Sequence, residues 1–409
     1  MRGSRRIVLV IMAVTALWAL VGGLFQPFLP LYIASVGGTA TDVGIAGASS
    51  ALAFLAAEAV WGWASDRVGA GRPLLISKLV TTAAFLGYLW RTELWWIYIL
   101  QFVRGISEVA MAPIGRALLA RHVASERRGT IMGLYFTTQS LARSGTGFVG
   151  GGLIDGIGFR ALFALCAALS FASGILAFLG LRGTRELDRA ADRASATAAA
   201  PTEGFRRQFT ILSILAGLGF WAQSGWWMFF PLFAATIVGL SASQVGILTS
   251  LAGIAVLVFT LPGGRLADRY GRKPLLMIGL AISSIPAVAI AIGAGTSFGA
   301  LAVLSFLLAA GNATSNPARQ ALIADIAPAG RQGLTMGVYG VAEDVGILVG
   351  PLLGGILWDR IGPGATFAMF AAVYFVTIAT AAVLLREPAR RRAPAADAAL
   401  AAPPPTPAD

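Results

Sequence analysis

Charge, cysteine and histidine are scarce in this sequence. Of its 409 residues only 12% are charged, against about 25% in a typical soluble domain, which excludes a soluble enzyme and a nucleic-acid-binding domain. The single cysteine, Cys166, forms no internal disulfide, and the single histidine, His122, supplies neither a zinc site nor a histidine proton relay. Since the chain lacks a G-x-x-x-x-G-K-[ST] loop, ATP is not its direct energy source. We expect no cofactor, no metal ion and no nucleic-acid partner.

Long apolar runs take the place of charge. Hydrophobic residues make up 57% of the chain, and they gather in runs of about 20 residues, the length that a helix needs to cross a bilayer. The sequence therefore predicts an all-α membrane protein with twelve transmembrane helices, over residues 7–36, 43–64, 73–90, 94–119, 130–154, 160–181, 209–238, 244–264, 274–294, 298–324, 334–357 and 364–385.

Basic residues are unevenly shared between the two sets of loops. Most of the 31 Lys and Arg residues, Lys78 among them, are assigned to one set, whereas the opposite loops hold only Arg91, Arg160 and Arg360. Because basic loops stay in the cytoplasm, both termini are predicted to be cytoplasmic. We expect a multi-pass protein of the cell inner (plasma) membrane that is a monomer in the lipid bilayer.

An internal repeat divides the chain in two. Residues 113–135 match residues 317–339, and the match continues through Asp155 and Asp359. Two repeats related by an axis along the membrane normal are a transporter arrangement, with the substrate site between the halves. The predicted domains are an N-terminal six-helix bundle, a cytoplasmic linker, a C-terminal six-helix bundle and a disordered cytoplasmic tail, over residues 1–182, 183–208, 209–387 and 388–409.

A loop rich in glycine and charge follows the second and the eighth segments. The second copy is G-R-L-A-D-R-Y-G-R-K, and the first is G-W-A-S-D-R-V-G-A-G-R. Each copy has an Asp at a helix end beside several cations, which suits an ionic latch on a neighbouring helix terminus; the alternative is that the loop cations only anchor the chain. The candidate latch residues are Gly62, Asp66, Arg67, Gly69, Arg72, Gly264, Asp268, Arg269, Gly271, Arg272, Lys273, Arg116 and Arg319.

This pattern resembles the signature loop of the major facilitator superfamily, and the resemblance covers essentially the whole chain. It implies two pseudo-symmetric six-helix bundles, rocker-switch alternating access, and a latch in which Asp66 and Asp268 hold the cytoplasmic side closed. The eleventh segment carries G-x-x-x-G-P-x-x-G-G at 346–355, which is similar to the antiporter motif of the drug:proton (multidrug efflux) branch. The family has that motif in the fifth segment, where this chain has Thr146 and Gly147 in place of Gly-Pro.

Four acids and four arginines are assigned to the membrane interior. Each costs at least about 2.5–3.5 kcal/mol at the bilayer centre, so each is expected to face a partner or an aqueous cavity. Glu108 and Arg104 are four residues apart on one helix and can pair directly; either Glu108 exchanges a proton while Arg104 tunes it, or the pair is purely structural. The candidate proton-coupling residues are Glu108, Arg104, Glu58, Glu343, Asp344 and Arg143.

Several pairings among these charges stay open. Arg116 and Arg319 either pair with Asp66 and Asp268 respectively or extend to the cytoplasm. In one arrangement Glu58 shares a proton with an acid of the eleventh segment, Glu343 or Asp344. In the other, one of those two acids pairs with Arg143.

Aromatic and amide side chains recur in the first, seventh and tenth segments. A cavity walled by such groups suits a lipophilic and even a cationic ligand; the alternative is packing within the bundle. The candidate cavity residues are Phe25, Gln26, Phe28, Gln223, Trp226, Trp227, Phe230, Asn312 and Asn316. The predicted function is secondary export of a small amphipathic or drug-like molecule in exchange for protons, and the alternative is a proton-coupled importer or uniporter.

Overall fold

The computed structural model describes residues 2–123, 125–181, 205–326 and 332–385. Helices make up nearly all of this part of the chain, and it contains no strand. The predicted tail (388–409) and most of the predicted linker lie outside the described residues. The helix after the linker begins at Phe205.

Each half of the chain supplies six spans. The N-terminal half consists of α1 (Arg2–Phe25), η1 (Gln26–Phe28), α2 (Leu29–Ser35), α3 (Ala40–Val68), α4 (Gly71–Trp90), α5 (Leu94–Glu108), α6 (Met111–His122), α7 (Ser125–Ser144), α8 (Thr146–Ile157) and α9 (Phe159–Gly180). The C-terminal half consists of α11 (Phe205–Thr236), α12 (Ala242–Tyr270), α13 (Arg272–Ala291), α14 (Phe298–Ile326), α15 (Gln332–Arg360) and α16 (Pro363–Leu384).

The predicted spans are confirmed as helical segments. Nine helical stretches in the described part are long and apolar enough to cross a membrane; the other three predicted spans are α5 with α6, α7 with α8, and α11. Three spans of the N-terminal half are interrupted, at η1, at residues 109–110 and at Gly145. Their counterparts α11, α14 and α15 are continuous, although each contains a proline.

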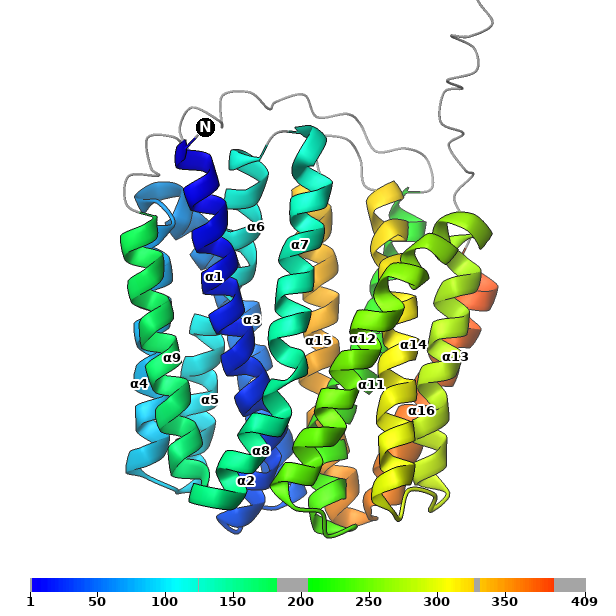
Figure 1. The fold of residues 1–409 in the computed structure, drawn as a ribbon. Coiled ribbons are helices and arrows are strands. Elements are labelled where there is room, and N and C mark those ends of the chain that lie inside the picture. The colour runs from blue at the N-terminus through cyan, green and yellow to red at the C-terminus, as the bar shows by residue number, and fades with distance from the viewer. Residues whose placement is uncertain (1, 124, 182–204, 327–331, 386–409) are drawn as a thin grey trace, which may run out of the picture.

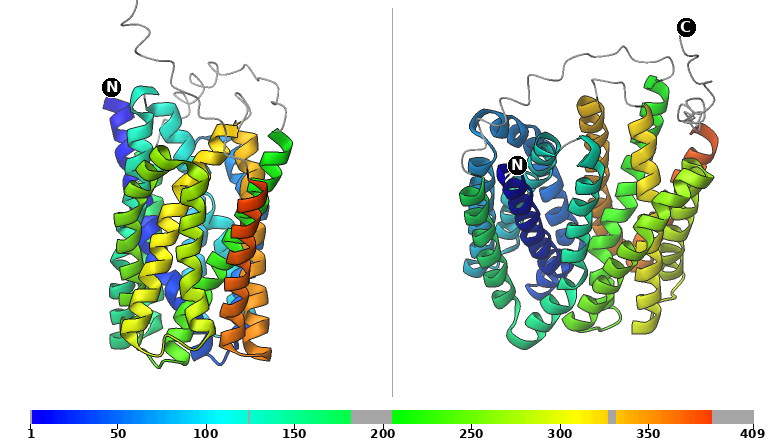
Figure 2. Two further views of the ribbon diagram at one scale, coloured as in Figure 1. Left: turned by 90° about the vertical axis from the view of Figure 1, so that its right-hand side faces the viewer. Right: turned by 45° about the horizontal axis from the view of Figure 1, so that its top comes forward.

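The two halves stand side by side, with all helices running between two ends of the molecule (Figure 1). We call the end at which α1 begins the upper end and the opposite end, where α2 leads into α3, the lower end. Between the halves, α3 packs against α15, and α8 packs against α12. The two further views show the same division into two bundles (Figure 2).

Two helices that begin at the lower end are capped in the same way. Thr39 precedes α3 and Ser241 precedes α12, and each forms a capping box with the third residue of its helix, Asp42 or Gln244. A capping box satisfies two backbone N–H groups at a helix start. The N–H groups of the first two helical residues, which lie between the two satisfied ones, remain available for acceptors from elsewhere.

The same two helices also end alike at the upper end. Gly69 follows α3 with φ of 81°, and Gly271 follows α12 with φ of 106°. Only glycine adopts such angles without steric cost. These glycines of the predicted latch loops therefore let the chain turn directly into α4 and α13.

Candidate functional site

A buried ion pair lies inside the N-terminal half. Nη1 of Arg104 contacts Oε2 of Glu108, as the four-residue spacing predicts, and the two side chains are only 3% and 6% exposed. Nε of Arg104 donates to Oε1 of Gln101 at 2.9 Å, and the Tyr88 hydroxyl donates to the same oxygen at 3.0 Å. The guanidinium also lies 4.8 Å from the ring centre of Phe25. This network holds Glu108 in one place, away from lipid.

Lys78 is a member of this site that the sequence interpretation missed. Its side chain in α4 is 2% exposed, its ammonium makes no hydrogen bond with the described residues, and it lies within electrostatic range of Glu108. Nζ is 6.0 Å from the ring centre of Trp18. Lys78 is counted among the cytoplasmic cations in the sequence interpretation, although it falls inside the predicted span 73–90. Its position within that span could have indicated a buried cation.

Arg143 lies near the same aromatic ring. Its guanidinium is 5.2 Å from the ring centre of Trp18, and it would touch a Cβ at Gly22. Trp18 is therefore approached by two cations of the protein, because Lys78 lies on it as well. Arg143, one of the predicted proton-coupling residues, also lies within electrostatic range of Glu108.

A second set of charges lies within each half and between the two halves. Nη2 of Arg319 is 3.7 Å from Oε1 of Glu343, and Nη2 of Arg116 is 3.7 Å from Oε1 of Glu58. Asp344 of α15 lies within electrostatic range of Glu58 on α3 in the other half. The structure thus brings Glu58 near an acid of α15, one of the arrangements that the sequence left open.

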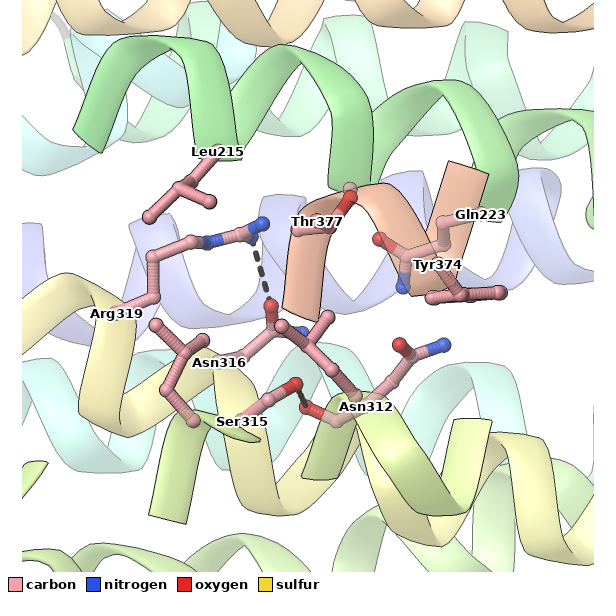
Figure 3. A pocket seen from close by; sticks show the side chains of 11 residues that line it. Leu215, Gln223, Asn312, Ser315, Asn316, Arg319, Tyr374 and Thr377 are labelled. Carbon is pink, nitrogen blue, oxygen red and sulfur yellow. Dashed lines mark hydrogen bonds between the residues drawn. The ribbon is translucent and has the colours of Figure 1, made fainter. Parts of the chain in front are cut away.

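A pocket inside the C-terminal half collects polar side chains from α11, α14 and α16 (Figure 3). Nη2 of Arg319 donates to Oδ1 of Asn316 at 2.7 Å, and the guanidinium lies 4.6 Å from the ring centre of Phe220. Three of the predicted cavity residues, Gln223, Asn312 and Asn316, line this pocket. The lining consists of Leu215, Gly219, Gln223, Leu276, Leu280, Asn312, Ser315, Asn316, Arg319, Tyr374 and Thr377.

The predicted aromatic wall is largely part of the hydrophobic core. Phe25, Phe28, Trp226 and Phe230 are each 2% exposed or less, so they do not line an open cavity in this state. Trp226 stacks on Phe230 with ring centres 4.8 Å apart. Such ring contacts bury large apolar areas within one bundle. This burial stabilises the rings in the core more than exposure to a cavity would.

Of the predicted aromatic and amide wall, Gln26 and Trp227 are exposed, the latter to 37%. The rings of Phe25 and Trp18 are already approached by the guanidinium groups of Arg104 and Arg143. These faces are therefore occupied by cations of the protein rather than free for a cationic ligand.

Two carboxylates join the halves at the lower end. Asp155 near the end of α8 accepts from the backbone N–H groups of Ala242 and Ser243 at 3.1 and 2.8 Å. Asp359 near the end of α15 accepts in the same way from Ala40 and Thr41 at 3.1 and 2.7 Å. We call these contacts, from Asp155 to the start of α12 and from Asp359 to the start of α3, the two carboxylate clasps.

Glycines allow the close approach that the carboxylate clasps require. A Cβ at Gly151 would overlap the backbone of Ala242, and a Cβ at Gly355 would overlap that of Ala40. Higher on α15, a Cβ at Gly44 would overlap the backbone of Pro351, whereas a Cβ at Gly337, nearer the upper end of α15, would meet no atom within 4 Å. The halves are thus in contact at the lower end, and α7 and α12 diverge toward the upper end (Figure 1).

The comparisons with known proteins decide the family. Residues 9–241 and 212–407 match the family model described as Major Facilitator Superfamily. The chain belongs to this superfamily. Its members are transporters, so the protein is a multi-pass secondary transporter of small molecules and not an enzyme. The architecture of two six-helix halves is the fold that the resemblance implied.

Relatives within the superfamily include drug-efflux proteins. The chain is 27% identical over 377 residues to the multidrug resistance protein MdtG of Proteus mirabilis, which covers 90% of this chain and 93% of that protein. It is 24% identical over 385 residues to a multi-drug resistance efflux pump PmrA homolog of Lactococcus lactis, covering 90% and 92%. Among solved structures, the nucleoside transporter NupG aligns with a TM-score of 0.75 at 16% identity, over 93% of this chain and 100% of that one.

In this superfamily member the cations of the signature loops contact their own halves. Arg67 lies 4.3 Å from the ring centre of Trp63, and Arg269 lies 5.4 Å from that of Tyr270. Nζ of Lys273 donates to the Leu385 carbonyl at 2.8 Å.

The rest of the predicted latch is only partly described. Arg272 of α13 contacts Asp325 of α14, which again joins two helices of one half. The surroundings of Gly62 and the side chains of Asp66 and Asp268 lie outside the described part. The latch itself, and the pairing of Asp66 and Asp268 with Arg116 and Arg319, therefore stay predictions.

Proposed function

We propose that this transporter exports an amphipathic, lipophilic molecule across the inner membrane in exchange for protons. The asymmetry of basic loops supports an orientation with both termini, and hence the upper end, in the cytoplasm. The relatives named for multidrug resistance support export. We keep the predicted division into 1–182, 183–208, 209–387 and 388–409 as part of this proposal, together with a monomeric state.

In this orientation the state described above is open to the cytoplasm. The carboxylate clasps join the halves on the extracytoplasmic side, and the divergence of α7 and α12 toward the upper end (Figure 1) supports an opening on the cytoplasmic side. The opposite state requires the clasps to part and the signature loops to close, with Asp66 and Asp268 as the proposed latch. Alternating access is then a rocking of one six-helix half against the other.

The observation that carries proton coupling is the buried Arg104–Glu108 pair. An ionised carboxylate in the low-dielectric interior is held by its partner cation, and a proton on Glu108 removes that attraction. Arg104 then retains only Gln101 as a hydrogen-bond acceptor among the described residues. A change of charge at this position biases the equilibrium between the two access states, which is what coupling requires.

A proton-coupled importer or uniporter is the second candidate function. It is favoured by Thr146 and Gly147, which stand in the fifth span where the antiporter motif has Gly-Pro. The helix is interrupted at Gly145 instead of bending at a proline. The direction of transport therefore has to be measured together with its coupling.

The test uses purified protein in liposomes with an imposed pH gradient and a panel of amphipathic compounds. The wild-type protein is expected to move a substrate against its gradient. In Glu108→Gln the rate of this transport is expected to fall at least about tenfold, while the substrate still binds. Glu93→Gln, which changes an exposed acid at the lower end, is the matched control. Gradient-driven accumulation by Glu108→Gln at the wild-type rate would remove Glu108 from the mechanism.

A further inference from the structure

Three cations of the N-terminal half share one carboxylate. Arg104 contacts Glu108 directly, and both Lys78 and Arg143 lie within electrostatic range of the same acid. No other acid of the described part interacts electrostatically with Lys78 or Arg143. When all four groups are ionised, the cluster therefore carries a surplus of positive charge, which is costly in a low-dielectric interior.

The two cations that lack an acid of their own meet at Trp18 of α1. Nζ of Lys78 lies 6.0 Å from the ring centre, and the Arg143 guanidinium lies 5.2 Å from it. The guanidinium also lies against α1 one turn further on, since its Nη2 would be 3.4 Å from a Cβ at Gly22. Side chains from α1, α4 and α7 thus come together at one ring.

The donors around this ring lack acceptors. Nε1 of Trp18 is buried and has no hydrogen-bond partner among the described residues. The Lys78 side chain is 2% exposed, and neither its ammonium nor the Arg143 guanidinium donates a hydrogen bond to the described residues. Buried donors are normally satisfied, because an unpaired one is costly. The partner that these groups lack is an acceptor, and the surplus of positive charge favours one that is negatively charged.

Arg143 connects this place with the space between the halves. Its side chain is exposed, and the next residue, Ser144, lies where a Cβ at Gly253 of α12 in the other half would overlap it. An anion that enters between the halves therefore meets the exposed Arg143 before the buried Lys78.

We infer that an anionic group binds beside Trp18 in the N-terminal half, held by the charges of Lys78 and Arg143, with Nε1 of Trp18 as a neutral donor. Two sources share this chemistry: a free inorganic anion and the negatively charged end of a transported molecule. With the anion bound, the surplus positive charge of the cluster is reduced. Anion binding requires neither export nor proton exchange, so it goes beyond the proposed function.

The test follows thermal unfolding of the purified protein in detergent while chloride replaces gluconate at constant ionic strength and pH. The unfolding temperature of the wild-type protein is expected to rise with chloride concentration, as binding to the folded state requires, and the rise yields a dissociation constant. Lys78→Met and Arg143→Gln are each expected to raise this constant at least about tenfold, because each removes a charged donor. The constant comes from the response to the anion, so a variant that is more stable without the anion remains informative.

Two further variants complete the series. Trp18→Phe keeps an aromatic ring but removes the Nε1–H donor, and it is expected to raise the dissociation constant several-fold. Arg206→Gln, which changes an exposed cation at the start of α11, is the matched control and is expected to leave the constant unchanged.

The same titration with phenylbutyrate and with its primary amide distinguishes the two sources. If the charged end of an organic molecule binds, phenylbutyrate acts at lower concentrations than chloride, and the amide does not act. If a free ion binds, chloride acts and phenylbutyrate does not. Either result supports an anion site.

No response to chloride together with equal responses to phenylbutyrate and its amide would overturn the inference. An unchanged dissociation constant in Lys78→Met or in Arg143→Gln would overturn it as well. If these two variants do not fold, Trp18→Phe decides in their place. Because the titration uses no gradient, its failure leaves the proposed function untouched, and a failure of gradient-driven transport leaves the anion site untouched.

Discussion

At the scale of single residues, Lys78 is a costly buried charge of the N-terminal half. Its ammonium is buried beside Trp18 and makes no hydrogen bond with the described residues, although Glu108 lies within electrostatic range. An intramembrane charge kept at such cost is expected to serve function rather than stability.

Lys78→Met is therefore expected to make the protein more stable and less active. Methionine keeps the hydrocarbon packing against Gly174, and replacing a poorly paired buried charge by an apolar side chain is often stabilising, by about 1–4 kcal/mol. A higher unfolding temperature in detergent, together with slower gradient-driven transport in liposomes, is the expected result. Lys78→Arg, which retains the charge, serves as the control; a destabilised Lys78→Met protein would contradict this account.

Residue-scale features were only partly predictable. The four-residue spacing predicted the contact between Arg104 and Glu108, because neighbours at that spacing share a helix face whatever the tertiary structure. Exposure of Phe25 and Trp226 could not be predicted, because a ring in a span can pack within its bundle or toward a cavity with the same sequence pattern. The pairing of Arg319 with Glu343 joins two helices, and no local pattern encodes it.

At the scale of helices, adjacent glycines of α8 have different surroundings. A Cβ at Gly151 would overlap the start of α12, whereas a Cβ at Gly152 would meet no atom within 4 Å. The first glycine therefore serves helix contact, and the second does not.

Gly151→Ala is expected to push α8 away from α12 and open the lower end, and Gly152→Ala is expected to leave it closed. Both changes raise helix propensity by about the same 1 kcal/mol, so they form a matched pair. Spin labels at the exposed residues Ile157 and Ile361, in a background with Cys166 replaced by serine, report the separation by double electron–electron resonance. Identical distance distributions in the two variants would rule out this role for Gly151.

The helices themselves were well predicted by sequence, since a bilayer requires long apolar runs and long runs are visible. The interruptions at 109–110 and at Gly145 were not predicted, because the same apolar composition is compatible with a continuous or a broken span. The clasps were missed for another reason: the acceptor is a side chain, but the donors are backbone groups of a distant helix, which carry no side-chain signature. The repeat did align Asp155 with Asp359.

At the scale of the whole molecule, charge acts oppositely at the two ends. The carboxylate clasps attract the halves to each other at the lower end, where each carboxylate meets the positive end of a helix dipole. Toward the upper end, Glu58 and Asp344 belong to different halves and lie within electrostatic range, so their like charges oppose closure. Both effects favour the state described here.

Asp155→Asn combined with Asp359→Asn is expected to open the lower end. A carboxylate at an exposed helix start contributes about 0.3–1 kcal/mol, so removal of both charges shifts the equilibrium by roughly three- to thirtyfold toward the opposite state. The labels at Ile157 and Ile361 are expected to report a longer distance. Glu93→Gln removes an acid at the same end that does not connect the two halves, and it should leave the distance unchanged. If the double variant gives the same distance as Glu93→Gln, the role of the clasps is refuted.

Glu58→Gln combined with Asp344→Asn is expected to favour the same opposite state from the other end. Removing the repulsion allows α3 and α15 to approach toward the upper end, and the population with an open lower end should then depend less on pH, with Glu108 still able to take up a proton. The same pair of labels, recorded at acidic and alkaline pH, measures this. A pH dependence equal to that of the wild-type protein would show that these acids do not sense the proton.

The reciprocity of the two clasps has an evolutionary consequence. The first half gives a carboxylate to a helix start of the second, and the second returns the equivalent one to the first, which is the pattern of an isologous contact between identical subunits. In an unfused ancestor, a single substitution would have created or destroyed both bonds at once. In the present chain Asp155 and Asp359 are separate residues, so each carboxylate clasp can change without the other.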